Sequence, residues 1–119
     1  MSLISELADM PGVIAAGEYS YRGDRYVCRG RLDDEDARRA SIMCRATTMG
    51  LHMQADILGG FCGEGCGLVP ARGWVVRGPR FTVCVVANVF CFLDNEEGAL
   101  NEVLALMRER LADAPTDLV

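Results

Sequence analysis

The chain has 119 residues, of which 50% are apolar and 24% are charged, and its formal net charge is −5 with no lysine. This composition excludes a disordered or low-complexity chain and provides enough apolar residues for the core of one domain. The acidic balance argues against nucleic acid as a partner, because phosphate binding requires a basic surface.

The first predicted elements are a short helix and a β-hairpin. Ser2 can cap the helix, and Pro11 with Gly12 ends it. Strands are predicted at Val13–Tyr21 and Tyr26–Arg31, where apolar residues run together or alternate. The Arg-Gly-Asp sequence between them supplies the turn, and we interpret it as a turn rather than an adhesion motif because the chain lacks an export signal.

A long helix is predicted from about Asp33 to Leu58, the longest stretch without a proline or a turn cluster. The four acidic residues at its start suit the positive end of a helix dipole. A broad apolar arc of this helix is expected to be buried. The arc consists of Ala37, Ala40, Met43, Cys44, Ala46, Thr47, Leu51, Met53, Ala55, Ile57 and Leu58.

The opposite side of the helix carries a stripe in which two large apolar residues lie among charged ones. The stripe consists of Arg38, Ile42, Arg45, Met49, His52 and Asp56. An apolar centre with a charged rim is typical of a protein interface. We therefore predict a homodimer in which two copies of this stripe pack together, with the helices antiparallel.

A glycine-rich loop is predicted at residues 59–73, followed by three strands and a helix. The strands are predicted at Gly73–Arg77, Arg80–Val86 and Val89–Leu93, separated by tight turns. Asp94 with Glu97 is placed like a capping box, and apolar residues at helical spacing follow it to about residue 112. The tail at residues 113–119 is expected to fray.

This order of elements predicts an α+β fold. Short connections make the paired strands antiparallel, and apolar residues on both faces of the strands require helices on both sides. We therefore expect a five-stranded antiparallel sheet with the long middle helix on one face and the two terminal helices on the other. The fold would form a single domain over residues 1–119, with an ordered core at about 3–112.

No apolar run approaches the about 20 residues of a membrane-spanning helix. Residues 1–11 lack both the basic start and the long apolar segment of an export signal. We therefore expect a cytoplasmic protein that does not bind a membrane, and thiols that stay reduced. Four of the six cysteines lie within apolar patterns and are interpreted as core residues: Cys28, Cys44, Cys84 and Cys91.

The other two cysteines, Cys62 and Cys66, lie in the glycine-rich loop, and three interpretations of them stay open. They are incidental residues of a flexible loop, a redox or partner-thiol pair, or a metal or cluster site. A redox dithiol usually has two intervening residues, whereas three separate this pair, and Glu64 would raise the thiol pKa. Two thiolates are too few for tetrahedral zinc unless a symmetric dimer supplies four.

Catalytic motifs are missing from the sequence. The only histidine, His52, belongs to the outer helix stripe, and the glycine-rich loop lacks the Lys-Ser/Thr ending of a phosphate loop. No serine-nucleophile or zinc-protease motif occurs. We therefore expect no enzyme activity, and we assign no catalytic, cofactor-binding or metal-binding residue.

Three segments resemble a known family. At residues 3–17 a short helix with leucines at regular spacing runs into Pro-Gly-Val and a series of small residues. The other two segments are the turn at Gly23 and the part of the middle helix at Ala40–Met53. With them the chain resembles the roadblock/dynein-light-chain family of small longin-like or profilin-like domains, from Leu3 to about Leu111. It looks more closely like a bacterial branch in which a Trp-bearing strand, here Trp74, precedes an Ala/Gly-Asn turn.

The resemblance implies a non-catalytic, dimeric scaffold or regulatory module that binds a protein partner, such as a small GTPase or an enzyme complex. Members of that family commonly pair through the middle helix and the adjacent strand. The family does not require the loop between Cys62 and Cys66, so a second hypothesis is a small redox accessory protein that uses this dithiol for thiol, sulfur or metal chemistry.

Overall fold

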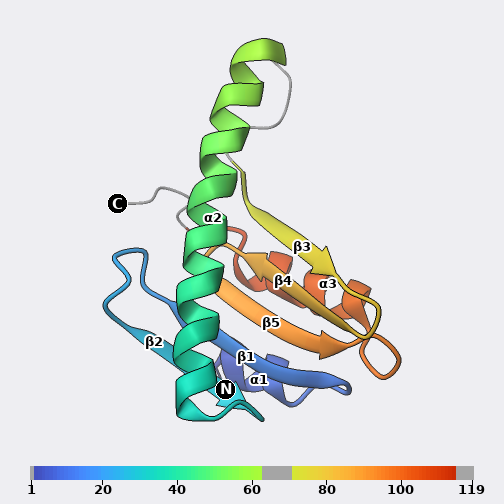
Figure 1. Ribbon diagram of the computed structural model, residues 1–119. Helices are drawn as coiled ribbons and strands as arrows, with labels where there is room; N and C mark the ends of the chain where they lie inside the picture. Colours follow the sequence, from blue (N-terminus) through green and yellow to red (C-terminus); the bar gives the residue numbers. More distant parts are fainter. Residues whose placement is uncertain (1, 63–70, 115–119) are drawn as a thin grey trace.

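The computed structural model describes residues 2–62 and 71–114. The elements are α1 (Leu3–Ala8), β1 (Val13–Tyr19), β2 (Tyr26–Gly30), α2 (Asp34–Cys62), β3 (Gly73–Arg77), β4 (Phe81–Val86), β5 (Val89–Asp94) and α3 (Leu100–Arg110). The strands form one sheet in the order β2-β1-β5-β4-β3, and every neighbouring pair is antiparallel (Figure 1).

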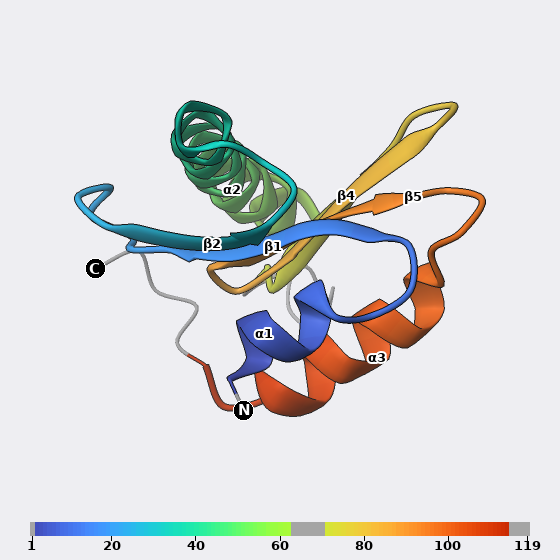
Figure 2. The same cartoon turned by 90° about the horizontal axis from the view of Figure 1, so that it is seen from below.

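The sheet lies between two layers of helices. Helix α2 crosses one face, and α1 and α3 lie side by side on the other (Figure 2). This arrangement confirms the predicted α+β sandwich. The central strands β1 and β5 are buried on both faces because each face is covered by a helix layer.

The face under α1 and α3 holds the larger core. Leu7 of α1 and Val103 and Met107 of α3 are fully buried against the sheet. The sulfur of Met107 lies 3.8 Å from the sulfur of Cys84 in β4. Burying each of these apolar side chains contributes roughly 1.5–3 kcal/mol to folding, so this layer holds the terminal helices in place.

The face under α2 is packed differently, because α2 contacts the sheet through small residues. These buried residues are Ala37, Ala40, Ser41, Cys44, Thr48 and Ala55. They pack over a floor that includes Tyr19, Val85 and Phe90. Small side chains let the helix axis approach the sheet closely, so the larger side chains of the predicted arc have no room on this side.

The predicted buried arc of α2 was therefore too broad. Met43, Met53, Ile57 and Leu58 are all exposed rather than buried. Ala46 is exposed as well. The stripe of small residues determines which side of the helix faces the sheet, and it turns most of the large apolar residues outward.

Helix α2 also continues past its predicted end at Leu58. It includes Gly59 and Gly60 and ends at Cys62. Extending an existing helix gains a hydrogen bond for each added residue, which offsets part of the roughly 1 kcal/mol that each glycine costs. At the other end, the backbone N–H of Asp36 donates to the carboxylate of Asp33 at 2.8 Å, as expected of a helix cap.

Other boundaries differ slightly from the predictions. Strand β1 ends two residues early, at Tyr19, because the backbone N–H of Ser20 already donates to the Arg25 oxygen in the turn, and β2 ends one residue early, at Gly30. Strand β4 begins one residue later and β5 ends one residue later than predicted. Helix α3 ends at Arg110, and residues 111–113 form a turn.

The predicted capping box of the last helix is wrong. The carboxylate of Asp94 accepts bonds from the backbone N–H groups of Glu96 and Glu97, at 2.8 and 3.1 Å. These bonds close a turn that precedes the helix. The N-cap of α3 is Ala99, which has no side-chain cap.

Candidate functional site

An exposed apolar surface runs along the side of α2 that points away from the sheet. We call it the outer face of α2. It consists of Ile42, Met43, Ala46, Met49, Gly50, Met53 and Ile57. The exposed fractions of its five large side chains lie between 39% for Met49 and 65% for Met53. A monomeric soluble protein rarely exposes a continuous row of this kind, so the outer face is a candidate interface.

The length of α2 adds to this surface. The helix has 29 residues, which corresponds to about 44 Å, whereas a seven-residue strand such as β1 spans only about 23 Å. The end of α2 therefore projects beyond the sheet (Figure 1). Phe61 near that end is 83% exposed. The projecting turns expose apolar groups that no described element covers.

The charged residues of the predicted interface stripe lie along one flank of this face. Arg38 pairs with Glu35 one turn earlier, at 2.6 Å. The Nε of Arg45 donates to the backbone oxygen of Tyr21 at 2.7 Å, so this side chain is half-buried against the β1–β2 turn. His52 is also half-buried, and Asp56 is exposed. Two of the four charged residues therefore already have partners within the chain.

Thr48 anchors α2 to two strands of the sheet. Its buried hydroxyl oxygen accepts a hydrogen bond from the Tyr19 hydroxyl at 2.8 Å and another from Trp74 Nε1 at 2.9 Å. Burial raises the pKa of Tyr19 to about 12, so the phenol stays protonated and remains a donor. These bonds fix the rotation of α2 and thereby its outer face.

The two loop cysteines lie at the limit of the described chain. Cys62 is the last residue of α2 rather than part of a loop, and Cys66 falls outside the described residues. Of the predicted core cysteines, Cys44, Cys84 and Cys91 are fully buried. Cys28 is only half-buried because β2 is an edge strand, and burial still raises its pKa.

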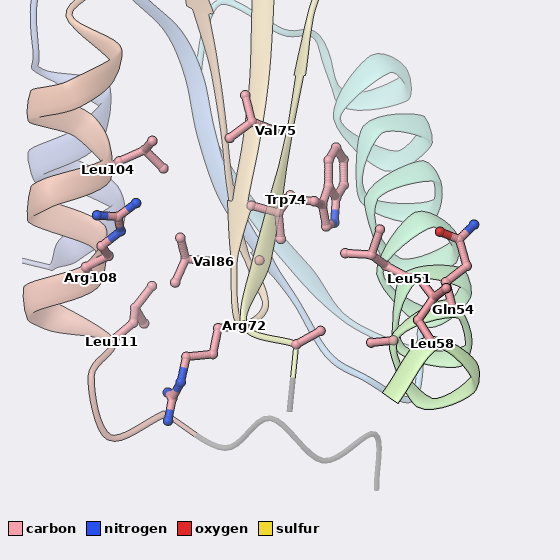
Figure 3. Close-up of a pocket in the computed structure, with 14 residues that line it drawn as sticks. Leu51, Gln54, Leu58, Arg72, Trp74, Val75, Val86, Leu104, Arg108 and Leu111 are labelled. Atoms are coloured by element: carbon pink, nitrogen blue, oxygen red, sulfur yellow. The ribbon is translucent and has the colours of Figure 1, made fainter. Parts of the chain in front are cut away.

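A cavity of about 820 Å³ lies where α2, β3, β4 and α3 come together (Figure 3). Its walls are largely apolar and include Leu51 and Trp74, with Leu104 on the side of α3 (Figure 3). Of the described residues in its lining, Arg72 and Arg108 are charged. Ala71 in its wall directly follows residues 63–70, which the structure does not describe, so we place no binding site there.

Residues 2–62 and 71–114 contain no group of three or more His, Cys, Asp or Glu side chains arranged to hold a metal ion. None of their helices is both long enough and apolar enough to cross a membrane.

The sequence interpretation found Ile42 and Met49 as exposed apolar residues, but it missed Met43, Met53 and Ile57 as members of the same surface. The sequence did contain a signal for which side of α2 contacts the sheet. Ala37, Cys44 and their small neighbours recur at helical spacing on a single side of α2, and small residues mark a close contact.

Two solved structures of other proteins have a fold similar to that of this chain. MglB from Myxococcus xanthus matches with a TM-score of 0.63 at 12% identity, over 89% of this chain and 80% of that chain. A Roadblock/LC7 domain from Streptomyces avermitilis matches with a TM-score of 0.54 at 18% identity, over 92% of this chain and 95% of that one. At these identities the likeness shows the fold, which is roadblock-like. No curated protein matches the chain.

A family model also matches residues 3–109. It is described as "Uncharacterized conserved protein (DUF2173)". The match extends from the first residue of α1 to the last turn of α3 and so includes every element of the sandwich. The chain therefore belongs to the DUF2173 family, whose fold in this member is roadblock-like.

Proposed function

We propose that the chain, as a single domain, is a non-catalytic scaffold or regulatory module that acts as a homodimer and binds a protein partner. The observation that carries the proposal is the outer face of α2, which is apolar along about four turns and is held in place by Thr48. The roadblock-like fold supports it, because the resemblance of the sequence to that family implies pairing through the middle helix.

Small residues in the middle of the outer face favour a close contact between two copies. Ala46 and Gly50 lie in the middle of the row, and an added Cβ on Gly50 would meet nothing within 4 Å. Small residues at the crossing point let two helices approach closely, while the larger side chains pack on either side. In a two-fold contact each residue of one copy meets the same surface of the other.

The apolar energy of such a contact is comparable to the cost of association. Burying a large apolar side chain fully is worth roughly 1.5–3 kcal/mol, and those of the outer face are about half exposed, so each gains about 1 kcal/mol. Ten such side chains in a dimer contribute about 10 kcal/mol, against association costs of about 4–15 kcal/mol. We therefore expect an association that depends on concentration.

Sedimentation of the wild-type chain tests this proposal. We expect a mass of twice 12.9 kDa at micromolar concentration and dissociation toward the single chain on dilution. A wild-type chain that stays at 12.9 kDa throughout the micromolar range contradicts the homodimer.

The proposed interface is the outer face together with the charged flank of Arg38, Arg45, His52 and Asp56. Arg38 and Arg45 keep their partners within the chain, so their contribution to a dimer is to fix register and orientation more than to add affinity. The protein partner would then bind the surfaces that the dimer leaves free, among them the edge strand β3, where Val75 and Val76 are exposed.

A further inference from the structure

A second, smaller cavity of about 210 Å³ lies between the β1–β2 turn and the first half of α2. We call it the hairpin pocket. Its lining includes three arginines, Arg25 from the turn and Arg38 and Arg45 from α2, and among the described residues Asp24 is its only carboxylate. This concentration of positive charge is notable in a chain whose net charge is −5.

The turn that forms one wall of the pocket is held by hydrogen bonds. The Ser20 hydroxyl oxygen accepts bonds from the backbone N–H groups of Asp24 and Arg25, at 3.2 and 3.1 Å. Gly23 adopts a φ of +82° and packs against Arg45, whose Nε would lie 3.0 Å from an added Cβ. The turn that carries Arg25 therefore lies against α2, where Arg38 and Arg45 line the same pocket although they are more than ten residues away in sequence.

The charges of the pocket are only partly neutralised within the chain. Asp24 accepts a hydrogen bond from the Ser20 hydroxyl at 2.7 Å, and that bond holds the pKa of its carboxyl below the usual value. Arg38 is paired with Glu35. Neither Arg25 nor Arg45 has an ion pair with any residue of the described chain. The charges of Asp24 and Glu35 together offset two of the three arginines, which leaves an excess of one positive charge.

We propose that the hairpin pocket binds an oxyanion, a phosphate or a carboxylate group, between Arg25 and Arg45. A guanidinium presents planar N–H donors that match the oxygens of such groups. The volume is below the roughly 300–1,000 Å³ of sites for drug-sized ligands, so the pocket accepts one anionic group rather than a whole cofactor. This inference goes beyond the proposed scaffold function. The pocket adjoins the proposed dimer interface, because Arg38, Ile42 and Arg45 belong to both.

The test is a titration of the full ¹⁵N-labelled chain with inorganic phosphate at low ionic strength. We expect saturable shifts confined to the amides around Gly23 and Ser41, both of which line the pocket. Arg25→Gln should weaken binding about tenfold, because a hydrogen bond to a charged group is lost. Arg22→Gln is the matched control, since Arg22 is exposed in the same turn and does not line the pocket. It should change the affinity less than twofold.

Acetate, titrated in the same way, distinguishes a ligand that bears a phosphate group from one that bears a carboxylate group. Tighter binding of phosphate assigns the pocket to a phosphate-bearing ligand, and tighter binding of acetate assigns it to a carboxylate. The proposal is overturned if neither anion gives local saturable shifts, or if Arg22→Gln weakens binding as much as Arg25→Gln. The second outcome would mean that the general charge of the turn attracts anions without a site.

Discussion

We expect the double variant Ile42→Glu, Met49→Glu to be a folded monomer at concentrations at which the wild-type chain is a dimer. Both residues are exposed in the single chain, at 54% and 39%, so the glutamates should change folding stability by less than about 0.5 kcal/mol each. In the dimer, four unpaired carboxylates would be buried, which costs several kcal/mol. A loss of at least about 4 kcal/mol corresponds to a thousandfold weaker dimer.

A matched control for this variant is Val27→Glu. Val27 on β2 is 54% exposed, the same fraction as Ile42, but it lies on an edge strand away from the outer face of α2. This control should leave the dimer intact in the same sedimentation experiment. If the double variant is folded and still dimeric, the outer face of α2 is not the interface.

Thr48→Val is the second change with a large expected effect. Valine has nearly the same shape as threonine, but it removes the oxygen that accepts hydrogen bonds from Tyr19 and Trp74. Each buried donor left without an acceptor costs about 1–3 kcal/mol, so we expect the free energy of unfolding to fall by about 3 kcal/mol. Urea unfolding followed by the fluorescence of the single tryptophan measures this loss.

The variant Thr48→Ser separates the contribution of the hydrogen bonds to stability from the contribution of packing. Serine keeps the acceptor oxygen and loses one methyl group, which should cost about 1 kcal/mol. The Tyr19 hydroxyl also lies 3.4 Å from the backbone oxygen of Ala87, which offers it a weaker acceptor in the valine variant. A valine variant that is no less stable than the serine variant would contradict the anchoring role of Thr48.

The order and type of the elements could be predicted because their signals are local. The consecutive apolar residues of β3 and its flanking glycines identify the strand at Gly73–Arg77, which the structure has at the same residues. The strand pairing followed from short turns such as Ala87-Asn88, where Ala87 adopts a φ of +54°. These features depend on residues close in sequence, so periodicity and turn chemistry are sufficient to find them.

The features that the sequence did not predict depend on contacts between distant residues. The buried side of α2 is decided by how its small residues fit over Tyr19 and Phe90, and this fit depends on the assembled sheet. The meeting of Thr48 with Trp74 and the hairpin pocket likewise arise only after folding. Periodicity alone also placed Met53 in the buried arc, although it is 65% exposed.

The most direct test of the proposed homodimer observes contacts across the outer face itself. A mixture of chains with ¹³C-labelled methionine methyl groups and unlabelled chains, studied by isotope-filtered nuclear Overhauser spectroscopy, reports only contacts between copies. We predict intermolecular signals from the methyl groups of Met49 and Met53, and none from Met107, which is fully buried within its own chain. If a sample shown to be dimeric gives no intermolecular signal from either Met49 or Met53, the outer face of α2 is not the dimer interface.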